Sequence, residues 1–253
     1  MSAIDTSVWY KSDYGTRLKP SSQFRDRAWP LGGYPCIGMW MFLLPGLAGF
    51  REFSALVERA RQSDSTILDL GCGLGQDLRL LAAHGVPTER MVAVDVEPRL
   101  WELGYELFKD GGGRMQAKFI QGDFHTMTDE QLAPVQGKVD LVIAAQFLHL
   151  FSYEGQLVAC KRIVALSKLG TTVVGFQQGH VRPVEYRRPW GVTFYQNRES
   201  FVKMWGAVQE ETRTVWDLEV REVSLLDWGM QEEDFAWMSE NRIGIEFVIS
   251  RVS

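Results

Sequence analysis

The feature that most constrains the fold of this chain is the segment 67–76, Ile-Leu-Asp-Leu-Gly-Cys-Gly-Leu-Gly-Gln, in which strand-forming residues end in alternating glycines. Glycine has no side chain to hold a ligand off and adopts backbone angles that other residues avoid, so this turn lets the main chain approach a ligand closely. Asp69, Gly71, Gly73 and Gly75 form the pattern Asp-x-Gly-x-Gly-x-Gly. We therefore expect a buried strand followed by a ligand-binding loop.

The spacing of the glycines bears on the kind of ligand. A dinucleotide-binding loop follows Gly-x-Gly-x-x-Gly and would have its third glycine at position 76, where this chain has Gln76. Asp69 precedes the glycines, where its carboxylate would repel a pyrophosphate and suit a cationic or amino-bearing ligand. S-adenosylmethionine has both an ammonium and a sulfonium group, so the sequence favours this cofactor over a nicotinamide dinucleotide. A tight turn without a ligand is the alternative for the loop taken alone.

Composition limits the fold and the partners. A chain of 253 residues with 45% hydrophobic content can bury a full core, and we expect one α/β domain with an added segment. The net charge of −5 gives no basic surface for nucleic acid, so a small-molecule substrate is favoured. Cys36, Cys72 and Cys160 have no metal-ligand spacing and are interpreted as free thiols. Because no secretory signal opens the chain, we expect a cytoplasmic protein.

One stretch, 36–50, has no charged residue, as a membrane segment would. It is too short for a spanning helix and is interrupted by Pro45, Gly46 and Gly49. We expect no membrane span and interpret the stretch as a buried or lid-like segment over a pocket rather than as a membrane-surface contact. The sequence leaves open whether the protein is a monomer or a homodimer.

From residue 65 onward, strand-like and helix-like segments alternate, which is typical of a parallel sheet with crossover helices. The expected strands are 65–70, 91–96, 118–121, 139–145 and 171–176. Pro98 and Ser152 are suited to begin helices after the second and fourth strands, and Asn197 is suited to begin one after the fifth. Two final strands, 215–223 and 244–251, are expected to form a closing hairpin with little room for a helix between them.

Acidic residues follow the next two expected strands. Because a ligand of an open parallel sheet lies beyond the carboxyl ends of its strands, these residues are candidates for the same site. Asp95 is placed to accept hydrogen bonds from ribose hydroxyls, and Asp123 to accept one from an adenine amino group. Phe124 or Val96 would pack on the ring face. Either aspartate alone has a helix cap as its alternative, but a cap does not explain three strand ends in register.

The ends of the fourth and fifth strands supply the remaining candidates. Ala145 and Gln146 are placed to face the group that the cofactor transfers. His149 lies in an apolar stretch and is interpreted either as a catalytic base or as a core histidine. Gln178 and His180, which follow the fifth strand, are candidates for substrate contact.

The segment 182–190 combines arginines with aromatic residues. Arg182, Arg187 and Arg188 alternate with Tyr186 and Trp190 in a stretch that would suit a bound carboxylate or a solvated loop. The pattern favours the solvated loop.

These motifs resemble those of the class I S-adenosylmethionine-dependent methyltransferases over about residues 65–251. The resemblance implies a Rossmann-like, seven-stranded, mostly parallel sheet with helices on both faces. A closer resemblance is to the fungal methyltransferases of meroterpenoid and polyketide pathways. It rests on Trp9-Tyr10-x-Ser12-Asp13-Tyr14-Gly15-x-Arg17, Tyr34-Pro35-Cys36-Ile37-Gly38, Gly75-Gln76-Asp77, residues 147–151 and residues 197–205.

The closer resemblance implies the domain organisation and the reaction. Residues 1–60 would form a lid on the cofactor-binding domain 61–253, with Tyr10 and Arg17 at the cofactor and Tyr14 at the substrate. Enzymes of this family methylate carboxyl or hydroxyl groups of secondary metabolites. The chain has neither the Asn-Pro-Pro-Tyr motif of enzymes that methylate planar amino groups nor the Asp-Asn pair that catechol methyltransferases use to hold magnesium.

The expected function is therefore a metal-independent O-methylation of a small apolar molecule. A carboxylate, with a pKa near 4, arrives ionised, whereas a phenol, with a pKa near 10, would benefit from a base such as His149. The alternative is a protein that binds S-adenosylmethionine without transferring its methyl group, as a regulator or a cyclase.

Overall fold

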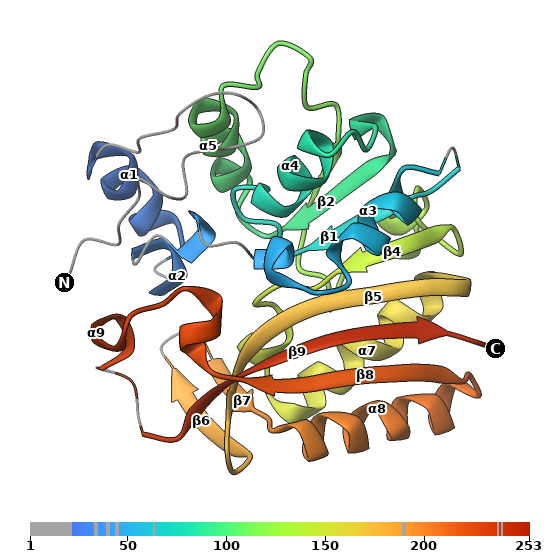
Figure 1. The fold of residues 1–253 in the computed structure, drawn as a ribbon. Coiled ribbons are helices and arrows are strands. Elements are labelled where there is room, and N and C mark those ends of the chain that lie inside the picture. The colour runs from blue at the N-terminus through green and yellow to red at the C-terminus, as the bar shows by residue number, and fades with distance from the viewer. Residues whose placement is uncertain are drawn as a thin grey trace.

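The computed structural model describes residues 22–32, 35–38, 41–43, 46–62, 64–188, 191–236, 238 and 240–253, and Figure 1 shows their arrangement. The central sheet has seven strands in the order β3-β2-β1-β4-β5-β9-β8, and β9 runs antiparallel to both of its neighbours. Its strands are β1 (Ile67–Leu70), β2 (Met91–Asp95), β3 (Lys118–Gln121), β4 (Val139–Ile143), β5 (Ser167–His180), β8 (Trp216–Val223) and β9 (Arg242–Arg251). The predicted seven-stranded, mostly parallel sheet is confirmed.

Helices cover both faces of this sheet (Figure 1). One face packs on α3 (Phe53–Ala60), α4 (Gln76–Ala83) and α5 (Pro98–Phe108), and the other packs on α6 (Asp129–Leu132), α7 (Tyr153–Leu166) and α8 (Arg198–Thr212). Within β1, Ile67 belongs to the core on the α3 side of the sheet and Leu68 to the core on the α7 side, because successive strand residues point to opposite faces. Each face is therefore a separate hydrophobic core.

The predicted helix starts are confirmed at the level of single hydrogen bonds. The Ser152 side chain accepts a hydrogen bond from the Gly155 N–H at 3.1 Å and begins α7. The Asn197 side chain accepts one from the Ser200 N–H at 2.9 Å and begins α8. Pro98 lies in the first turn of α5, where the missing N–H has no cost.

Strand β5 is longer than its apolar run predicts. The sequence predicts a strand over 171–176, but the structure extends it to Ser167–His180. The reason is pairing with β9, in which residues Thr172–His180 are in register with Arg242–Ser250 and satisfy the backbone of polar residues such as Gln178. The extension carries the end of β5 beyond the neighbouring strand ends.

Two segments that the sequence analysis did not predict lie after the parallel part of the sheet. The solvated loop expected at 182–190 is wrong, because β6 (Val184–Arg188) and β7 (Gly191–Tyr195) pair as an antiparallel hairpin. The expectation of little room between the last two strands is also wrong, because η5 (Leu225–Trp228) and α9 (Glu232–Phe235) lie there. In β6 the side chains alternate between half-buried and exposed, a strand period that the charged residues obscure in the sequence.

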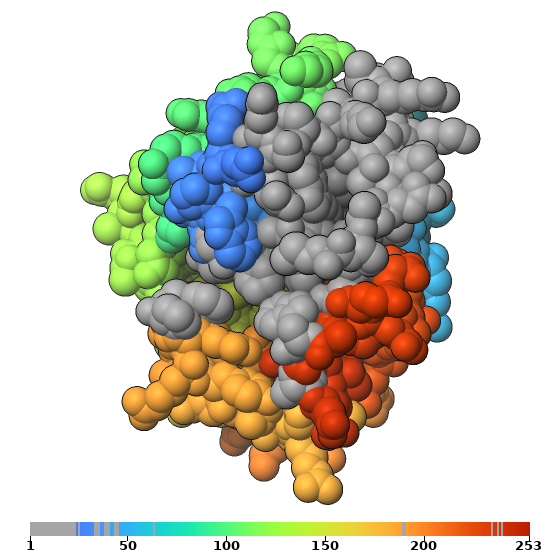
Figure 2. Space-filling view, turned by 90° about the vertical axis from the view of Figure 1, so that its left-hand side faces the viewer, coloured from blue at the N-terminus to red at the C-terminus, as the bar shows by residue number. Residues whose placement is uncertain are grey.

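The described part of the N-terminal segment packs on the domain rather than away from it. It contains α1 (Ser22–Gly32), α2 (Pro35–Gly38), η1 (Met41–Leu43) and η2 (Gly46–Gly49). Phe24, Ala28 and Ile37 share a core cluster with Leu103 and Leu107 of α5. Figure 2 shows α1 in blue, the region of the hairpin in orange and the segment between β8 and β9 in red on one face of the molecule. The predicted lid 1–60 stays a prediction, and Tyr10, Tyr14 and Arg17 lie outside the described residues.

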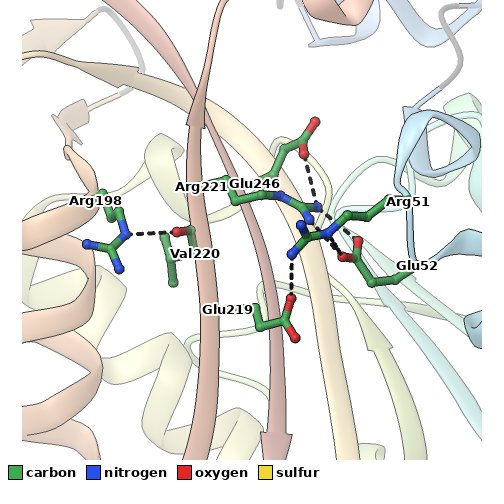
Figure 3. Close-up of polar contacts among 7 residues, drawn as sticks. All are labelled: Arg51, Glu52, Arg198, Glu219, Val220, Arg221 and Glu246. Atoms are coloured by element: carbon green, nitrogen blue, oxygen red, sulfur yellow. Dashed lines mark hydrogen bonds and ion pairs between the residues drawn. The ribbon is translucent and has the colours of Figure 1, made fainter.

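An ion-pair network fastens the start of α3 to the far edge of the sheet (Figure 3). Arg221 of β8 donates to both carboxylate oxygens of Glu52, at 2.7 and 2.9 Å, and to Glu246 of β9 at 3.2 Å. Arg51 pairs with Glu52 and donates to Glu219 at 2.9 Å. The segment that leads from η2 into α3 is therefore held against β8 and β9.

The cysteines and the lengths of the helices bear on two further expectations. Cys36, Cys72 and Cys160 are free thiols, as predicted. Among the described residues, no helix has the length and apolar character needed to cross a membrane.

Candidate active site

A cavity of about 510 Å³ opens at the carboxyl ends of the parallel strands, where the sheet topology places ligands. One half of it is lined by residues that the sequence analysis selected from four different strand ends. These residues are Gly71, Gly73, Asp95, Val96, Asp123, Phe124, Ala145 and Gln146. Residues that are distant in the sequence are therefore brought together as predicted from the parallel register.

The glycine loop lets its backbone face this cavity. Gly73 has a φ of +51°, and a Cβ added to it would meet no described atom within 4 Å, so a side chain here would extend into the cavity. Gly75 has a φ of +68°, and here the neighbouring side chains exclude any larger residue, because an added Cβ would lie 2.4 Å from the Trp101 ring. Gly75 does not line the cavity; it allows α4 and α5 to pack closely behind the loop.

Asp95 connects the end of β2 to the glycine loop. Its Oδ2 accepts the Gly73 N–H at 2.8 Å, and its Oδ1 accepts the Glu97 N–H at 2.9 Å. Burial raises the pKa of the Asp95 carboxyl, and the hydrogen bonds from these amides act against that rise. Each oxygen keeps a lone pair, so the carboxylate can hold the loop and still accept from a ligand in the cavity.

Asp69, in β1 next to the loop, is not among the side chains that line the cavity, and its predicted contact with the ligand stays a prediction. It is buried, and its Oδ2 has no hydrogen-bond partner among the described residues. Burial, followed by the neighbouring charges of Asp77 and Asp95, raises the pKa of Asp69. Burial also raises the pKa of Asp77 to about 6. The buried carboxyls of Asp69 and Asp77 therefore hold their protons more tightly than exposed carboxyls do.

Replacing Asp77 with asparagine should remove part of the pH dependence of stability. A carboxyl whose folded pKa is raised stabilises the fold below its unfolded pKa, near 4, and this contribution is lost as the pH rises through about 6. A rise of the pKa from about 4 to about 6 corresponds to about 3 kcal/mol of folding free energy. Asp77→Asn should therefore be more stable than the parent by about 2–3 kcal/mol at pH 8 and equally stable at pH 4. Urea unfolding at the two pH values measures this.

The matched control for this variant is Asp217→Asn, because Asp217 is an exposed residue of β8. Its effect should stay within about 0.5 kcal/mol at both pH values. An Asp77→Asn protein that is equally destabilised at pH 4 and pH 8 would contradict the assignment of the raised pKa.

A buried ion pair that the sequence analysis missed supports the loop from behind. The side chains of Arg79 and Asp110 are 1% and 0% exposed, and Arg79 Nε lies 2.6 Å from Asp110 Oδ2. Arg79 Nη1 also donates to the Leu74 carbonyl at 2.6 Å. The guanidinium lies over the rings of Trp101, Tyr105 and Phe108. In the sequence, Arg79 stands among the leucines of segment 78–81, and nothing near it points to Asp110.

The other half of the cavity is lined by residues of the hairpin, of β5 and β9, of the segments after β4 and between β8 and β9, and of the N-terminal elements. The lining side chains here include Ile37, Met41, Phe42, Leu150, Phe151, Phe176, Gln178, Arg188, Thr193, Tyr195, Trp228, Met238, Arg242 and Glu246. We call this the acceptor half. Of the two substrate-contact candidates on β5, Gln178 lines it and His180 does not; the His180 ring nitrogen Nδ1 lies 2.6 Å from the Arg182 carbonyl instead.

His149 lies between the two halves and is a weak base. Its side chain is 7% exposed, stacks on Tyr195, and has a buried Nδ1 without a partner among the described residues. Burial, followed by the charges of Arg242 and Arg188, lowers the pKa of His149 to about 3. The imidazole is therefore neutral at physiological pH, which favours an orienting role over proton abstraction.

Comparison with known proteins places this geometry in a family. Residues 67–170 match the family model described as a methyltransferase domain. The chain is 36% identical to the O-methyltransferase phiE of a fungus (Fungal sp., strain ATCC 74256) over 79% of this chain and 67% of that protein. The chain belongs to the class I S-adenosylmethionine-dependent methyltransferases. Membership confirms the predicted cofactor, S-adenosylmethionine, and the predicted enzyme class.

Other relatives of this methyltransferase are also fungal. It is 32% identical to the O-methyltransferase atr3 of Stereocaulon alpinum, over 78% of this chain and 58% of the relative. It is 30% identical to the methyltransferase adrK of Penicillium roqueforti, over 77% of this chain and 71% of the relative. The aligned part of the methyltransferase thus spans between 58% and 71% of the length of these two proteins.

Solved structures share the fold at low sequence identity. The methyltransferase resembles the 1,6-didemethyltoxoflavin-N1-methyltransferase of Burkholderia thailandensis with a TM-score of 0.56 and 16% identity, over 81% of this chain and 79% of that one. It resembles the [4+2]-cyclase SpnF with a TM-score of 0.55 and 16% identity, over 79% and 80% of the two chains. Because a methyltransferase and a cyclase match equally well, the fold alone does not decide the reaction.

Proposed function

We propose that this methyltransferase transfers a methyl group to a carboxyl or hydroxyl oxygen of a small, apolar, ring-containing secondary metabolite, by a metal-independent route. The observation that supports this most is one cavity that joins the glycine loop at Gly73 and Asp95 to an acceptor half rich in aromatic side chains. The fungal relatives named as O-methyltransferases support an oxygen acceptor.

The cofactor half fits S-adenosylmethionine in the following way. Asp95 would accept hydrogen bonds from the ribose hydroxyls, and Asp123 would accept one from the adenine amino group. Phe124 and Val96, which line the same part of the cavity, would pack on the adenine ring. Gly71 and Gly73 would contact the methionine part through their backbone. Tyr10, Arg17 and Tyr14 remain predictions for the same site.

Methyl transfer mainly requires that the acceptor oxygen is aligned with the methyl group of the cofactor. Bound S-adenosylmethionine supplies an activated methyl group. Ala145, Gln146 and His149 lie where they can orient an oxygen toward that group, and the apolar side chains around them exclude water. A carboxylate acceptor needs no base, since it is ionised near pH 7. Cys36, Ile37, Met41 and Phe42 line the cavity from the N-terminal side, which supports the proposal that residues 1–60 form a lid.

Replacing His149 with glutamine should have a small effect on turnover. Glutamine keeps a hydrogen-bonding group at this position, and loss of an orienting contact should lower kcat less than about 10-fold, whereas loss of a general base costs about 100-fold to 10,000-fold. Because the pKa of His149 is about 3, the pH profile of kcat between pH 6 and 9 should not change. A 1,000-fold loss, or a profile that loses an ionisation in this range, would make His149 the base instead.

The proposal is tested by incubating the protein with S-adenosylmethionine carrying a ¹³C-labelled methyl group and a fungal extract. The expected product has the label in a methyl ester or a methyl ether, which NMR distinguishes from methyl on nitrogen or carbon. Tight binding of the cofactor without any labelled product would favour a regulator or a cyclase. Calorimetric titration with S-adenosylmethionine and with NAD, in which NAD is expected to give no heat, excludes a dehydrogenase.

A further inference from the structure

The acceptor half contains two arginines that come from different parts of the chain. Arg188 is the last residue of β6, and Arg242 is the first residue of β9. Their guanidinium carbons lie 5.1 and 5.0 Å from the centroid of the same ring, that of Tyr186, and the guanidinium of Arg242 also lies 4.0 Å from the centroid of the Tyr195 ring. Both guanidinium groups therefore pack on the Tyr186 ring, and both arginines line the cavity.

The hairpin presents these groups by its strand period. In β6, Tyr186 and Arg188 are half-buried while Glu185 and Arg187 are exposed. In β7, the buried residues Thr193 and Tyr195 also alternate, and Thr193 is in register with Tyr186. One face of the hairpin thus lines the acceptor half and the other faces solvent.

The charge of Arg188 has no acidic partner in the part of the chain that the structure describes. Among the described residues, no carboxylate lies within ion-pair distance of Arg188, and its buried Nε has no hydrogen-bond partner. A buried donor of this kind is costly unless something pairs with it.

Two described acidic residues that line the cavity near these arginines, Glu246 and Asp227, have hydrogen-bond partners of their own. Glu246 accepts hydrogen bonds from Arg221 at 3.2 Å and from Trp228 Nε1 at 3.1 Å, and Asp227 accepts the Ser224 N–H at 2.9 Å. Arg188 and Arg242 both line the cavity, as does His149, whose pKa their charges lower. The buried, unpartnered Nε of Arg188 therefore suits an anionic group supplied by a ligand.

We propose that Arg188 and Arg242 form the recognition site for an anionic oxygen group, a carboxylate or a phenolate, of the methyl acceptor. The planar guanidinium donates two parallel hydrogen bonds to such a group and keeps it ionised. His149, held neutral beside it, donates or accepts a third hydrogen bond. This inference rests on the proposed function for the identity of the ligand, and it assigns Arg188 and Arg242 as the residues that decide acceptor specificity.

The test is a calorimetric titration of the protein loaded with S-adenosylhomocysteine. The probes are 2,4-dihydroxybenzoate and 1-naphthoate, each compared with its uncharged amide. The acids should bind at least about 10-fold more tightly than the amides, as expected for hydrogen bonds to a charged group. Arg188→Gln should remove this preference, and Arg188→Lys, which keeps the charge without the planar fork, should keep part of it.

Arg187→Gln is the matched control, because Arg187 is the neighbouring residue on the solvent face of the hairpin. It should leave the preference for acids unchanged, and all variants should keep the melting temperature and the affinity for S-adenosylhomocysteine of the parent protein. Equal affinity for acids and amides, no binding of either acid at 10 mM, or a preference that survives in Arg188→Gln would overturn the proposal. Because the titration measures binding alone, a failure of methyl transfer to any acceptor would refute the proposed function and leave this result standing.

Discussion

Replacing Asp110 with alanine is expected to lower the free energy of unfolding by about 3–5 kcal/mol, because it leaves a buried positive charge without its partner. Arg79 is 1% exposed and has both of its closest ionic contacts on Asp110, at 2.6 and 3.1 Å. The same guanidinium holds the Leu74 carbonyl of the glycine loop, so the variant should also bind S-adenosylhomocysteine more weakly. Urea unfolding and calorimetric titration measure the two effects.

The control is Glu106→Ala in the last turn of α5, four residues before Asp110. Glu106 pairs with Arg27 at 2.6 Å, but the two side chains are 53% and 56% exposed. Removing an exposed pair should cost less than about 1 kcal/mol. The double variant Arg79→Met with Asp110→Leu should recover much of the stability lost in Asp110→Ala, because it removes both buried charges. If Asp110→Ala costs no more than Glu106→Ala, the ion pair does not support the loop as described.

Replacing Asp95 with alanine is expected to weaken binding of S-adenosylhomocysteine by at least about 100-fold, since each hydrogen bond to a charged group contributes about 1.5–3 kcal/mol and two ribose hydroxyls are proposed to lose theirs. The variant also loses the acceptor of the Gly73 N–H, which orders the glycine loop. Calorimetric titration of S-adenosylhomocysteine measures the loss.

Glu97→Gln tests whether the effect belongs to Asp95 in particular. Glu97 lies two residues further on, caps α5 through the Arg99 N–H, and does not line the cavity. Its affinity for S-adenosylhomocysteine should stay within about twofold of the parent, since no ligand contact is lost. An Asp95→Ala protein that keeps the parent affinity would remove Asp95 from the cofactor site.

Much of the fold was predictable because its signals are local. Strand β3 was predicted at its observed bounds, and the helices that begin after Ser152 and Asn197 have the predicted caps. The cofactor half was predictable for a related reason. In a parallel sheet the strand ends meet at one edge, so Gly73, Asp95 and Asp123 converge wherever the fold is formed.

The acceptor half was not predictable because its contacts are nonlocal. The charged residues near position 187 favour a solvated loop because they hide a strand period. Nothing local shows that Arg188 and Arg242 share the ring of Tyr186. The pairing of Arg79 with Asp110 likewise depends on how α4 and α5 pack. The Asp69 carboxyl is buried, and its predicted contact with the cofactor stays a prediction.

A crystal structure of the protein with S-adenosylhomocysteine tests the proposed site most directly. In it, the ribose hydroxyls should contact the Asp95 carboxylate, the adenine should lie beside Val96 and Phe124, and the sulfur should face the acceptor half between Gln146 and His149. Arg188 should then lie on the side of the cavity where the methyl group would be delivered. A ribose held away from Asp95, or a sulfur directed away from His149 and Arg188, would contradict the proposed site.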